Sequence, residues 1–367
     1  MRGIPCLGGS GTAVAQAGSA AAEMAKDDGE HAGVAATNAQ RAFWLLLSLG
    51  ALLVIALASI AVGSKPIAIE TVLEALFRYD DSNDHAIIMA LRVPRTILGL
   101  VVGAALGLAG ALIQALTRNP LADPGILGVN AGASFFVMLA VGLFGFTSIN
   151  SYIWFAFAGA IFATVIVYAI GAVGRGAATP IRLTLAGIAI GAVLSGITSG
   201  LALLNPQTFD RLRFWGAGSL TAPGYDNIVI IAPFVAVGIV LALIAARPLN
   251  AIALGDDLAA SLGANITRTR SIVIVAVTLL AGAATAAAGP IGFIGLMVPH
   301  VARWIVGPDQ RWILAFTLVL SPSLLLASDI IGRVVMRPGE LQVGIVTAFV
   351  GAPVLILLAR RRKVSGL

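Results

Sequence analysis

The 367-residue sequence has little charge and few lysines, and these absences exclude several classes of protein. Charged residues make up 11% of the chain, against about a quarter in an ordinary soluble domain. The lysines are Lys26, Lys65 and Lys363, and none of them follows a glycine. The sequence therefore has no G-x-x-x-x-G-K-[ST] phosphate-binding loop, and the chain does not hydrolyse ATP by that mechanism.

Cysteine and histidine are also scarce. Cys6 is the only cysteine, so one chain forms no internal disulfide, and we interpret it as a free thiol. No metal-binding Cys/His spacing, no G-x-S-x-G motif and no H-E-x-x-H motif occurs. The pI of 10.1 does not indicate nucleic-acid binding, because no basic cluster is interleaved with aromatic residues. We expect this chain itself to bind no cofactor and no metal.

What the sequence has instead is long apolar runs. Hydrophobic residues make up 59% of the chain, and a helix needs about 20 apolar residues to cross a bilayer. The runs are continuous rather than alternating, which favours helices over a barrel. The sequence predicts an all-α polytopic membrane protein. Its spans are expected near residues 42–62, 93–116, 126–145, 152–173, 181–204, 227–246, 270–288, 290–306, 311–331 and 341–359.

Two of these spans share one uncharged run from Ser271 to Pro299. That run is too long for a single crossing, and Gly289-Pro290 is the natural place for a break, because both residues interrupt helices. We expect a hairpin there, which brings the total to about ten transmembrane helices.

The basic residues predict the orientation. With the N-terminus inside, fifteen Lys and Arg residues lie on the inner side and eight on the outer side. Positive residues collect in the cytoplasm, so both termini are expected there, in a multi-pass protein of the plasma membrane. Residues 1–40 have no apolar segment, and we expect a disordered cytoplasmic tail in which Met24 is an alternative start. Residues 41–363 then form the transmembrane domain.

Small residues recur every four positions in three of the spans. Such faces let helices approach closely where lipid gives no hydrophobic drive. The series are Gly99, Gly103 and Gly107; Gly187, Gly191, Ser195 and Ser199; and Gly344, Ala348 and Ala352. They predict a large, tightly packed bundle and say nothing about a substrate.

Arginines on the predicted outer side have two interpretations. Arg92 and Arg95 are three residues apart at a helix start, and Arg333 follows Asp329 by four residues. The arginines can steer and orient an acidic partner. Alternatively, they lie at the membrane interface, with an internal Asp329–Arg333 pair.

The longest polar inner loop contains a short amphipathic pattern. Asp256 and Asp257 supply the acidic first turn of a helix, and Gly263 a stop. Leu254, Leu258 and Leu262 share one face of that helix. The segment either docks into a groove of a partner or lies on the membrane, and the sequence favours neither.

Titratable residues near the spans suggest a second transport mechanism. His300 and Asp329 are the candidates, and intramembrane charges are costly and often functional. A proton-coupled secondary transporter would use them and would move its substrate without ATP. Both residues lie close to predicted helix ends, where a polar cap is the alternative.

Motifs along the chain resemble the FecCD family, the permeases of ATP-binding-cassette (ABC) importers for iron–siderophores, haem and vitamin B12. The likeness extends over about residues 42–361. Its motifs are Arg92-Val-Pro-Arg95, Gln114, Asn119-Pro-Leu-Ala, Pro124, Leu127-Gly128, Trp215-Gly-Ala-Gly-Ser219, Leu254-Gly-Asp-Asp-Leu-Ala, Gly292-Phe-Ile-Gly-Leu-Met-Val-Pro-His300, Asp329, Arg333, Glu340, Val343-Gly344 and Gly351-Ala-Pro353.

The resemblance implies a fold, partners and site residues. It implies the type II ABC importer permease fold, a second permease copy or paralogue, two ATPase subunits that hold ATP and Mg²⁺, and an extracytoplasmic solute-binding protein. The binding protein would dock on Arg92, Arg95 and Arg333. Residues 254–270 would be the coupling segment that seats on the ATPase, with Leu254, Gly255, Asp256, Asp257, Leu258, Leu262 and Gly263 as its motif. Asn119 and Leu121 would belong to the cytoplasmic gate. An iron–siderophore is the first expectation for the cargo, with haem or cobalamin as alternatives.

Overall fold

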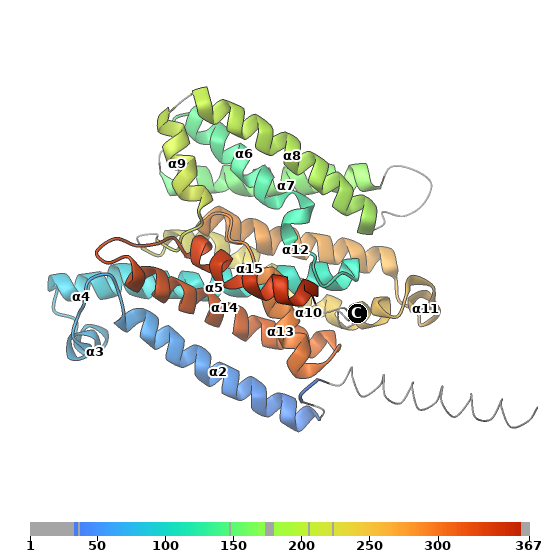
Figure 1. Cartoon of the computed structure of the whole chain (residues 1–367), viewed down its shortest axis with the longest axis horizontal. Helices are drawn as coiled ribbons and strands as arrows, with labels where there is room; N and C mark the ends of the chain where they lie inside the picture. Colours follow the sequence, from blue (N-terminus) through green and yellow to red (C-terminus); the bar gives the residue numbers. More distant parts are fainter. Residues whose placement is uncertain are drawn as a thin grey trace, which may run out of the picture.

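A computed structural model describes residues 33–35, 37–146, 148–172, 180–204, 206–221 and 224–360, and within these ranges the chain is helical and has no strand. Figure 1 shows most of the long helices running along the long axis of the molecule. Among the described residues, seven helices are long and apolar enough to cross a membrane, and α6, α13 and α15 are shorter apolar helices.

Each predicted span coincides with one observed helix, which confirms the fold class. The helices are α2 (Asn38–Ala61), α5 (Val93–Thr117), α6 (Val129–Gly142), α7 (Ile149–Gly171), α8 (Pro180–Leu204), α10 (Asp226–Ala253), α12 (Ile266–Ala288), α13 (Ile294–Val306), α14 (Gln310–Val335) and α15 (Val343–Arg360). The predicted break is also observed, because α12 ends at Ala288 and Gly289 has φ 73°, in the left-handed region that favours glycine.

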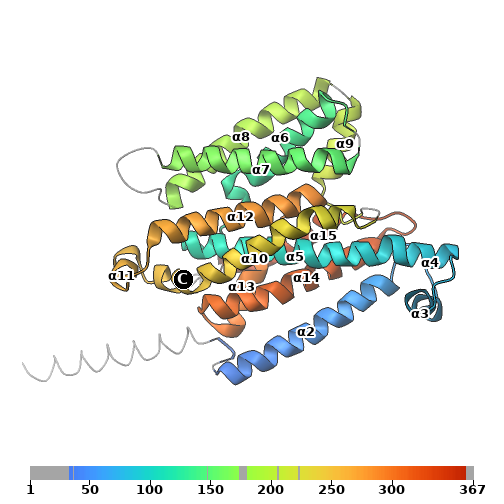
Figure 2. The ribbon, with the colours of Figure 1, turned by 180° about the vertical axis from the view of Figure 1, so that it is seen from behind.

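Short helices that the sequence did not predict lie in the connections. The chain between α2 and α5 forms α3 (Ile69–Phe77), α4 (Asn83–Ile87) and the π-helical turn η1 (Ile88–Arg92), and α9 (Pro206–Gly216) follows α8. The short helix α11 (Asp256–Ser261) lies at the opposite end of the molecule from α4 (Figure 2). We call these two ends the α4 end and the α11 end.

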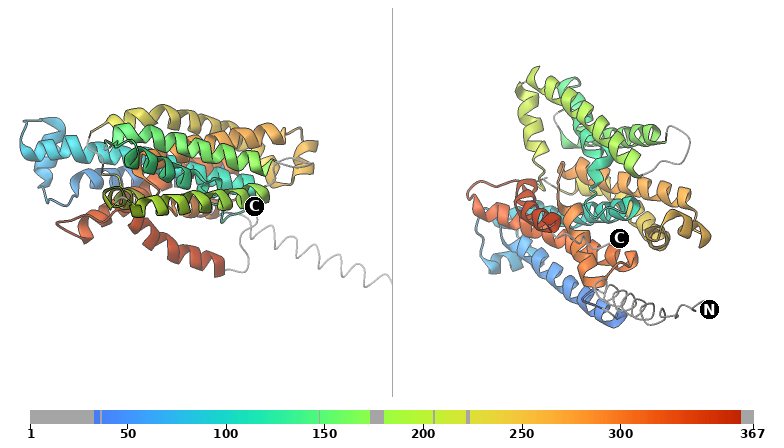
Figure 3. Two further views of the ribbon diagram at one scale, coloured as in Figure 1. Left: turned by 90° about the horizontal axis from the view of Figure 1, so that it is seen from above. Right: turned by 45° about the vertical axis from the view of Figure 1, so that its right-hand side comes forward.

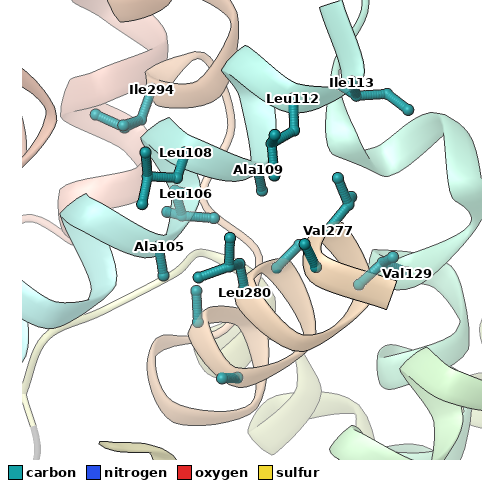
Figure 4. Packing of buried hydrophobic residues seen from close by; sticks show 14 of the residues in the cluster. Ala105, Leu106, Leu108, Ala109, Leu112, Ile113, Val129, Val277, Leu280 and Ile294 are labelled. Atoms are coloured by element: carbon teal, nitrogen blue, oxygen red, sulfur yellow. The ribbon is translucent and has the colours of Figure 1, made fainter. Parts of the chain in front are cut away.

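Helix α5 is the centre of the fold. It contacts α10, α12, α13 and α14, and nearly all of its residues after Pro94 are buried. A helix that is apolar all round has no solvent-facing side and therefore belongs inside a bundle. Figure 4 shows this core, where Ala105 and Leu108 of α5 lie near Leu280 of α12 and Ile294 of α13.

The glycine series of α5 has the close packing that the sequence predicts. A Cβ atom added to Gly103 would lie 2.6 Å from the Cα atom of Pro322 in α14. A Cβ atom on Gly107 would overlap the side chain of Ser321 in α14. Gly110 follows the series on the same helix, and a Cβ atom there would overlap the carbonyl group of Gly295 in α13. Close contacts at these points leave no room for any other residue, which explains why glycine is present.

Helices α6, α7, α8 and α9 form a second layer beside α12 (Figures 1 and 3). This layer contacts the core through α12, which packs against both α6 and α7. Close backbone contact is used here too, because Gly132 of α6 and Gly159 of α7 face each other. The chain is thus a helical core around α5 with a smaller helical layer on one side.

The segment that precedes α2 is attached to α13. The backbone N–H groups of Val34 and Ala35 donate to the carbonyl oxygens of Trp304 (3.1 Å) and Ile305 (2.8 Å). These carbonyls belong to the last turn of α13, where a helix leaves its acceptors unpaired. Thr37 and Gln40 then form a capping box that begins α2. The predicted tail includes residues 33–40, and the rest of it, 1–32 and 36, lies outside the described residues.

Candidate functional site

Arginines and carboxylates from three segments meet at the α4 end, and we call Arg92, Arg95, Asp329, Arg333 and Glu340 the arginine cluster. Arg95 of α5 binds Asp329 of α14 with two nitrogens, Nη2 to Oδ1 at 2.7 Å and Nε to Oδ2 at 3.0 Å. Its third nitrogen, Nη1, lies 2.6 Å from Oε2 of Glu340. Arg333 also pairs with Asp329, at 2.9 Å. Asp329 is completely buried, so its charge is satisfied entirely by these two guanidinium groups.

Two arginines of the cluster, together with Arg337, hold the C-terminal end of α2. The last carbonyls of a helix have no partner within the helix and carry partial negative charge. Arg92, Arg333 and Arg337 donate to this end. The accepting carbonyl oxygens are those of Ser59, Ile60, Ala61, Val62, Gly63 and Lys65. The predicted excess of outer arginines therefore has a structural use, because it fastens α2 to α5 and α14.

The structure buries the three arginines for which the family resemblance implies docking. Arg92 is 5% exposed, Arg95 9% and Arg333 1%. The internal Asp329–Arg333 pair, which the spacing left as an alternative, is present. The part of the cluster that remains accessible from outside the chain is the part that faces a cavity.

A pocket of about 340 Å³ opens onto the arginine cluster. Its charged lining residues are Lys65, Arg92, Arg95, Arg333 and Glu340. Cations outnumber carboxylates in this lining, and Glu340 is the only acid there. Charge-assisted hydrogen bonds between guanidinium and carboxylate groups are among the strong ones in proteins, so the pocket suits a carboxylate brought from outside.

Glu340 is a site residue that the sequence analysis named among the family motifs but to which it assigned no role. It is 30% exposed in its side chain and lies between α14 and α15. Partial burial favours the neutral form, but the hydrogen bond and charge of Arg95 outweigh this and lower the pKa of Glu340 below its usual range. The sequence did contain a signal for this role, because Glu340 is the only acidic residue after Asp329 and so the only later candidate to pair with the outer arginines.

At the α11 end, the predicted coupling segment contains the expected short helix. Helix α11 spans Asp256–Ser261. Leu254, Leu258 and Leu262 are 62%, 48% and 63% exposed. Large exposed apolar groups near one another mark surfaces that bind a partner or a membrane, so the two alternatives from the sequence both remain at this point.

Glycines bound α11 on both sides. Gly255 has φ 115° and Gly263 has φ 82°, and a Cβ atom on either would meet open space. At the predicted stop, the N–H of Gly263 donates to Ala260 and that of Ala264 to Ala259, which is a Schellman motif. Backbone conformation, rather than lack of room, requires glycine at both positions.

Asp256 links α11 to two other helices. Its Oδ1 accepts a hydrogen bond from Nη2 of Arg118, at the end of α5, and its Oδ2 accepts one from Nη2 of Arg270 in α12, at 2.7 Å. The predicted gate residues follow Arg118 directly. The side chain of Asn119 accepts a hydrogen bond from the N–H of Leu121 (2.9 Å), and Leu121 is 42% exposed. The structure thus brings the coupling motif and the gate motif together.

The residues of the proton-coupled alternative lie in different surroundings. His300 is buried against the ring of Trp304, with ring centres 4.8 Å apart. Asp329 is held in the arginine cluster, with both oxygens engaged. Over the described ranges, no group of three or more His, Cys, Asp or Glu residues is placed to hold a metal ion.

Comparison with known proteins relates this architecture to transport. The sequence model of the FecCD transport family matches residues 51–361. The chain is 52% identical over 334 residues to the ferric enterobactin transport system permease protein of Escherichia coli, covering 91% of this chain and 98% of that protein. It is 40% identical over 320 residues to an iron(3+)-hydroxamate import system permease protein of Bacillus subtilis, covering 87% of this chain and 82% of that protein.

A solved structure has the same fold. It shows an inward-facing conformation of a metal-chelate type ABC transporter, with a TM-score of 0.76 and 25% sequence identity. The match covers 86% of this chain and 98% of the other.

Proposed function

The chain belongs to the FecCD transport family, and on that premise we propose that it forms part of the translocation pathway of an ABC importer for a ferric siderophore. The observation that carries this proposal is the 52% identity, over nearly the full length of both chains, to a permease for ferric enterobactin. The hydroxamate permease, which is less similar, also takes an Fe³⁺ chelate. A chelate of Fe³⁺ is therefore the substrate class.

The proposed assembly contains a second permease copy or paralogue, two ATPase subunits and an external solute-binding protein. ATP and Mg²⁺ belong to the ATPase subunits, because this chain has no phosphate-binding loop. The fifteen-to-eight distribution of basic residues supports cytoplasmic termini. In that orientation the α4 end faces outward and the α11 end faces the cytoplasm. Nucleotide and binding protein prefer different conformations, and this difference alternates which end of the pathway is open.

In this assembly the exposed leucines of residues 254–270 face the ATPase. Three large apolar side chains on and beside one short helix suit a hydrophobic groove of a partner. The loop lies at the cytoplasmic end in the proposed orientation, where the ATPase subunits bind. We therefore assign the coupling role to this segment in preference to membrane contact.

At the other end, the arginine pocket would receive an acidic side chain of the binding protein. Because Glu340 already occupies Nη1 of Arg95, an incoming carboxylate competes with it. While the binding protein is absent, Glu340 thus occupies the position on Arg95 that the partner's acidic side chain would take. Its partial exposure makes it the more easily displaced of the two carboxylates, since Asp329 is completely buried.

Replacing Glu340 with glutamine is expected to tighten docking of the binding protein. The competing pair is largely buried, with side chains 10% and 30% exposed for Arg95 and Glu340, so its loss frees a strong charged donor for the incoming carboxylate. A gain of about 1 kcal/mol corresponds to roughly fivefold in affinity. Surface plasmon resonance between the loaded binding protein and the permease–ATPase complex in nanodiscs measures this. Glu74→Gln removes an exposed acid of α3 outside the pocket and serves as the control. Equal affinities of Glu340→Gln and the unaltered complex would contradict the competition.

The function itself is tested by purification and reconstitution. The tagged chain is purified in mild detergent, and its co-purifying chains are identified by mass spectrometry. We expect an ATPase with a phosphate-binding loop, and ATP-dependent uptake of a radiolabelled ferric siderophore when the complex and the binding protein are placed in liposomes. A chain that purifies alone and moves the chelate with a proton gradient and no ATP would overturn the proposal.

A further inference from the structure

One carboxylate connects the coupling segment to the gate motif. Asp256 opens α11, and its two oxygens bind two arginines from different helices, Arg118 and Arg270. Among the residues that the structure describes, these are the ion pairs that α11 makes with other helices. A carboxylate held at both oxygens has a defined position, because two separate guanidinium groups fix it.

Arg118 has a backbone conformation that is unusual for a residue other than glycine. It is the C-cap of α5 with φ 50° and ψ 36°, in the left-handed region. Glycine is the usual residue in this position at a helix end. An arginine here accepts unfavourable backbone geometry, and such outliers collect at functional positions. Asn119, the first residue of the gate turn, is bonded to Arg118 directly.

The neighbouring helix α10 is fixed independently of α11, which leaves the Asp256–Arg118 contact as the direct connection between α11 and the gate turn. The end of α10 is held to α14, because Asn250 Nδ2 donates to Asp309 Oδ1 at 2.9 Å and the N–H of Gln310 donates to Asn250 Oδ1 at 2.8 Å. Gly255 follows the end of α10, and a Cβ atom added to it would have no atom within 4 Å. The body of α10 is therefore anchored, while α11 is bounded by glycines and tied through Asp256.

We infer that Asp256 is the positioning residue that transmits movement of the coupling segment to the gate turn through Arg118. The inference rests on the proposed function, in which residues 254–270 contact the ATPase. The three side chains are 36%, 41% and 12% exposed for Arg118, Asp256 and Arg270. The exposed Arg118–Asp256 pair adds little to stability, so its contribution is to position the gate turn relative to α11.

The test measures transport per ATP in the complete importer. The permease–ATPase complex is reconstituted in liposomes with its binding protein, and uptake of the ferric chelate and release of phosphate are followed together. With Asp256→Asn, the ATPase subunits of the complex are expected to keep hydrolysing ATP. The amount of chelate transported per ATP is expected to fall about tenfold, which is within the range of coupling between sites in proteins. Asp256→Glu keeps the charge and is expected to restore most of the ratio.

Asp257→Asn is the matched comparison. It removes the same charge from the same turn, and Asp257 has no side-chain hydrogen bond or ion pair with the described part of the chain. Any loss it causes therefore belongs to contact with the ATPase. The inference requires Asp256→Asn to lower transport per ATP clearly more than Asp257→Asn. Equal losses, or failure of Asp256→Asn to co-purify with the ATPase, overturn it.

A second measurement observes the gate directly. Cys6 is the only cysteine, so Cys6→Ser with Leu121→Cys gives one labelling site at the gate. Labelling by a water-soluble maleimide is timed with and without ATP. ATP is expected to change the rate when Asp256 is present and to leave it unchanged in Asp256→Asn. A change of equal size in both overturns the inference while leaving the proposed function standing. Uptake by the unaltered chain without any ATPase overturns both.

Discussion

Replacing Asp329 with asparagine is expected to lower the free energy of unfolding by about 3–5 kcal/mol, the usual cost of breaking a buried ion pair. The carboxylate is completely buried and engages Arg95 and Arg333 together. An amide leaves Arg333 without its carboxylate partner and leaves Arg95 with Glu340 alone, although both guanidinium groups are largely buried. Thermal unfolding of the purified chain in detergent measures the loss, together with the yield of protein in the membrane.

The effect extends to α2, because Arg333, which loses its carboxylate partner, donates to the carbonyl oxygens of Ser59 and Val62 at the end of that helix. We expect faster hydrogen exchange across residues 59–65 in Asp329→Asn than in the unaltered chain. The control is Asp210→Asn, which removes an acid from an exposed pair with Arg213 at 3.5 Å and is expected to change stability by no more than about 1 kcal/mol. Similar losses in the two variants would show that Asp329 does not hold the cluster together.

The same variant distinguishes the two transport mechanisms. If Asp329 carried protons, Asp329→Asn would fold normally and lose only uptake driven by a proton gradient. If it organises the arginine cluster, stability falls first, and ATP-driven uptake falls with the amount of folded protein. Measuring uptake per folded complex, rather than per cell, separates these results.

Replacing Gly110 with alanine is expected to lower the free energy of unfolding by about 3 kcal/mol, at the upper end of the usual cost of overpacking. The added methyl group would overlap the carbonyl of Gly295, which is backbone and cannot turn away. Separating α5 from α13 also strains the hydrogen bond from Gln114 Nε2 to the carbonyl of Leu296 (2.9 Å) and that from Arg303 Nη2 to Gln114 Oε1 (3.1 Å). Denaturation in mixed micelles measures the loss.

Gly50→Ala is the matched control for this substitution. Gly50 lies within α2, and a Cβ atom there meets nothing within 4 Å. Alanine in place of glycine inside a helix stabilises by about 0.5–1 kcal/mol, so this variant is expected to be slightly more stable. The packing explanation fails if Gly110→Ala is as stable as Gly50→Ala.

The spans could be predicted from the sequence because membrane crossing depends on local composition and length. The break at Gly289 was equally local. Helices α3, α4 and α9 were not predicted, since they lie in connections where no apolar period of sufficient length stands out. The glycine series of α5 predicted close packing but not its partners, because one helix does not specify which neighbour its small face meets.

The site was predictable only in part, for a related reason. The Asp329–Arg333 pair is readable from a spacing of four residues on a helix. The Arg95–Asp329 pair joins residues 234 apart and the Arg118–Asp256 pair residues 138 apart. Such pairings depend on tertiary packing. Family resemblance implied coupling and gate roles for two motifs, but it did not indicate that one carboxylate links them. It also implied docking arginines without revealing their burial.

The separation of Arg95 from Asp329 has a consequence for biosynthesis. The arginine emerges from the ribosome 234 residues before its carboxylate, and at about 5–20 residues per second this interval lasts roughly 10 to 50 s. During that time α5 has neither its counter-charge nor the later helices that enclose it. The insertion machinery must therefore keep an almost entirely apolar, glycine-faced helix with an unpaired guanidinium near the membrane surface until α14 arrives. Slower translation of the second half of the gene would prolong this exposed state and reduce the yield of folded permease without changing its final stability.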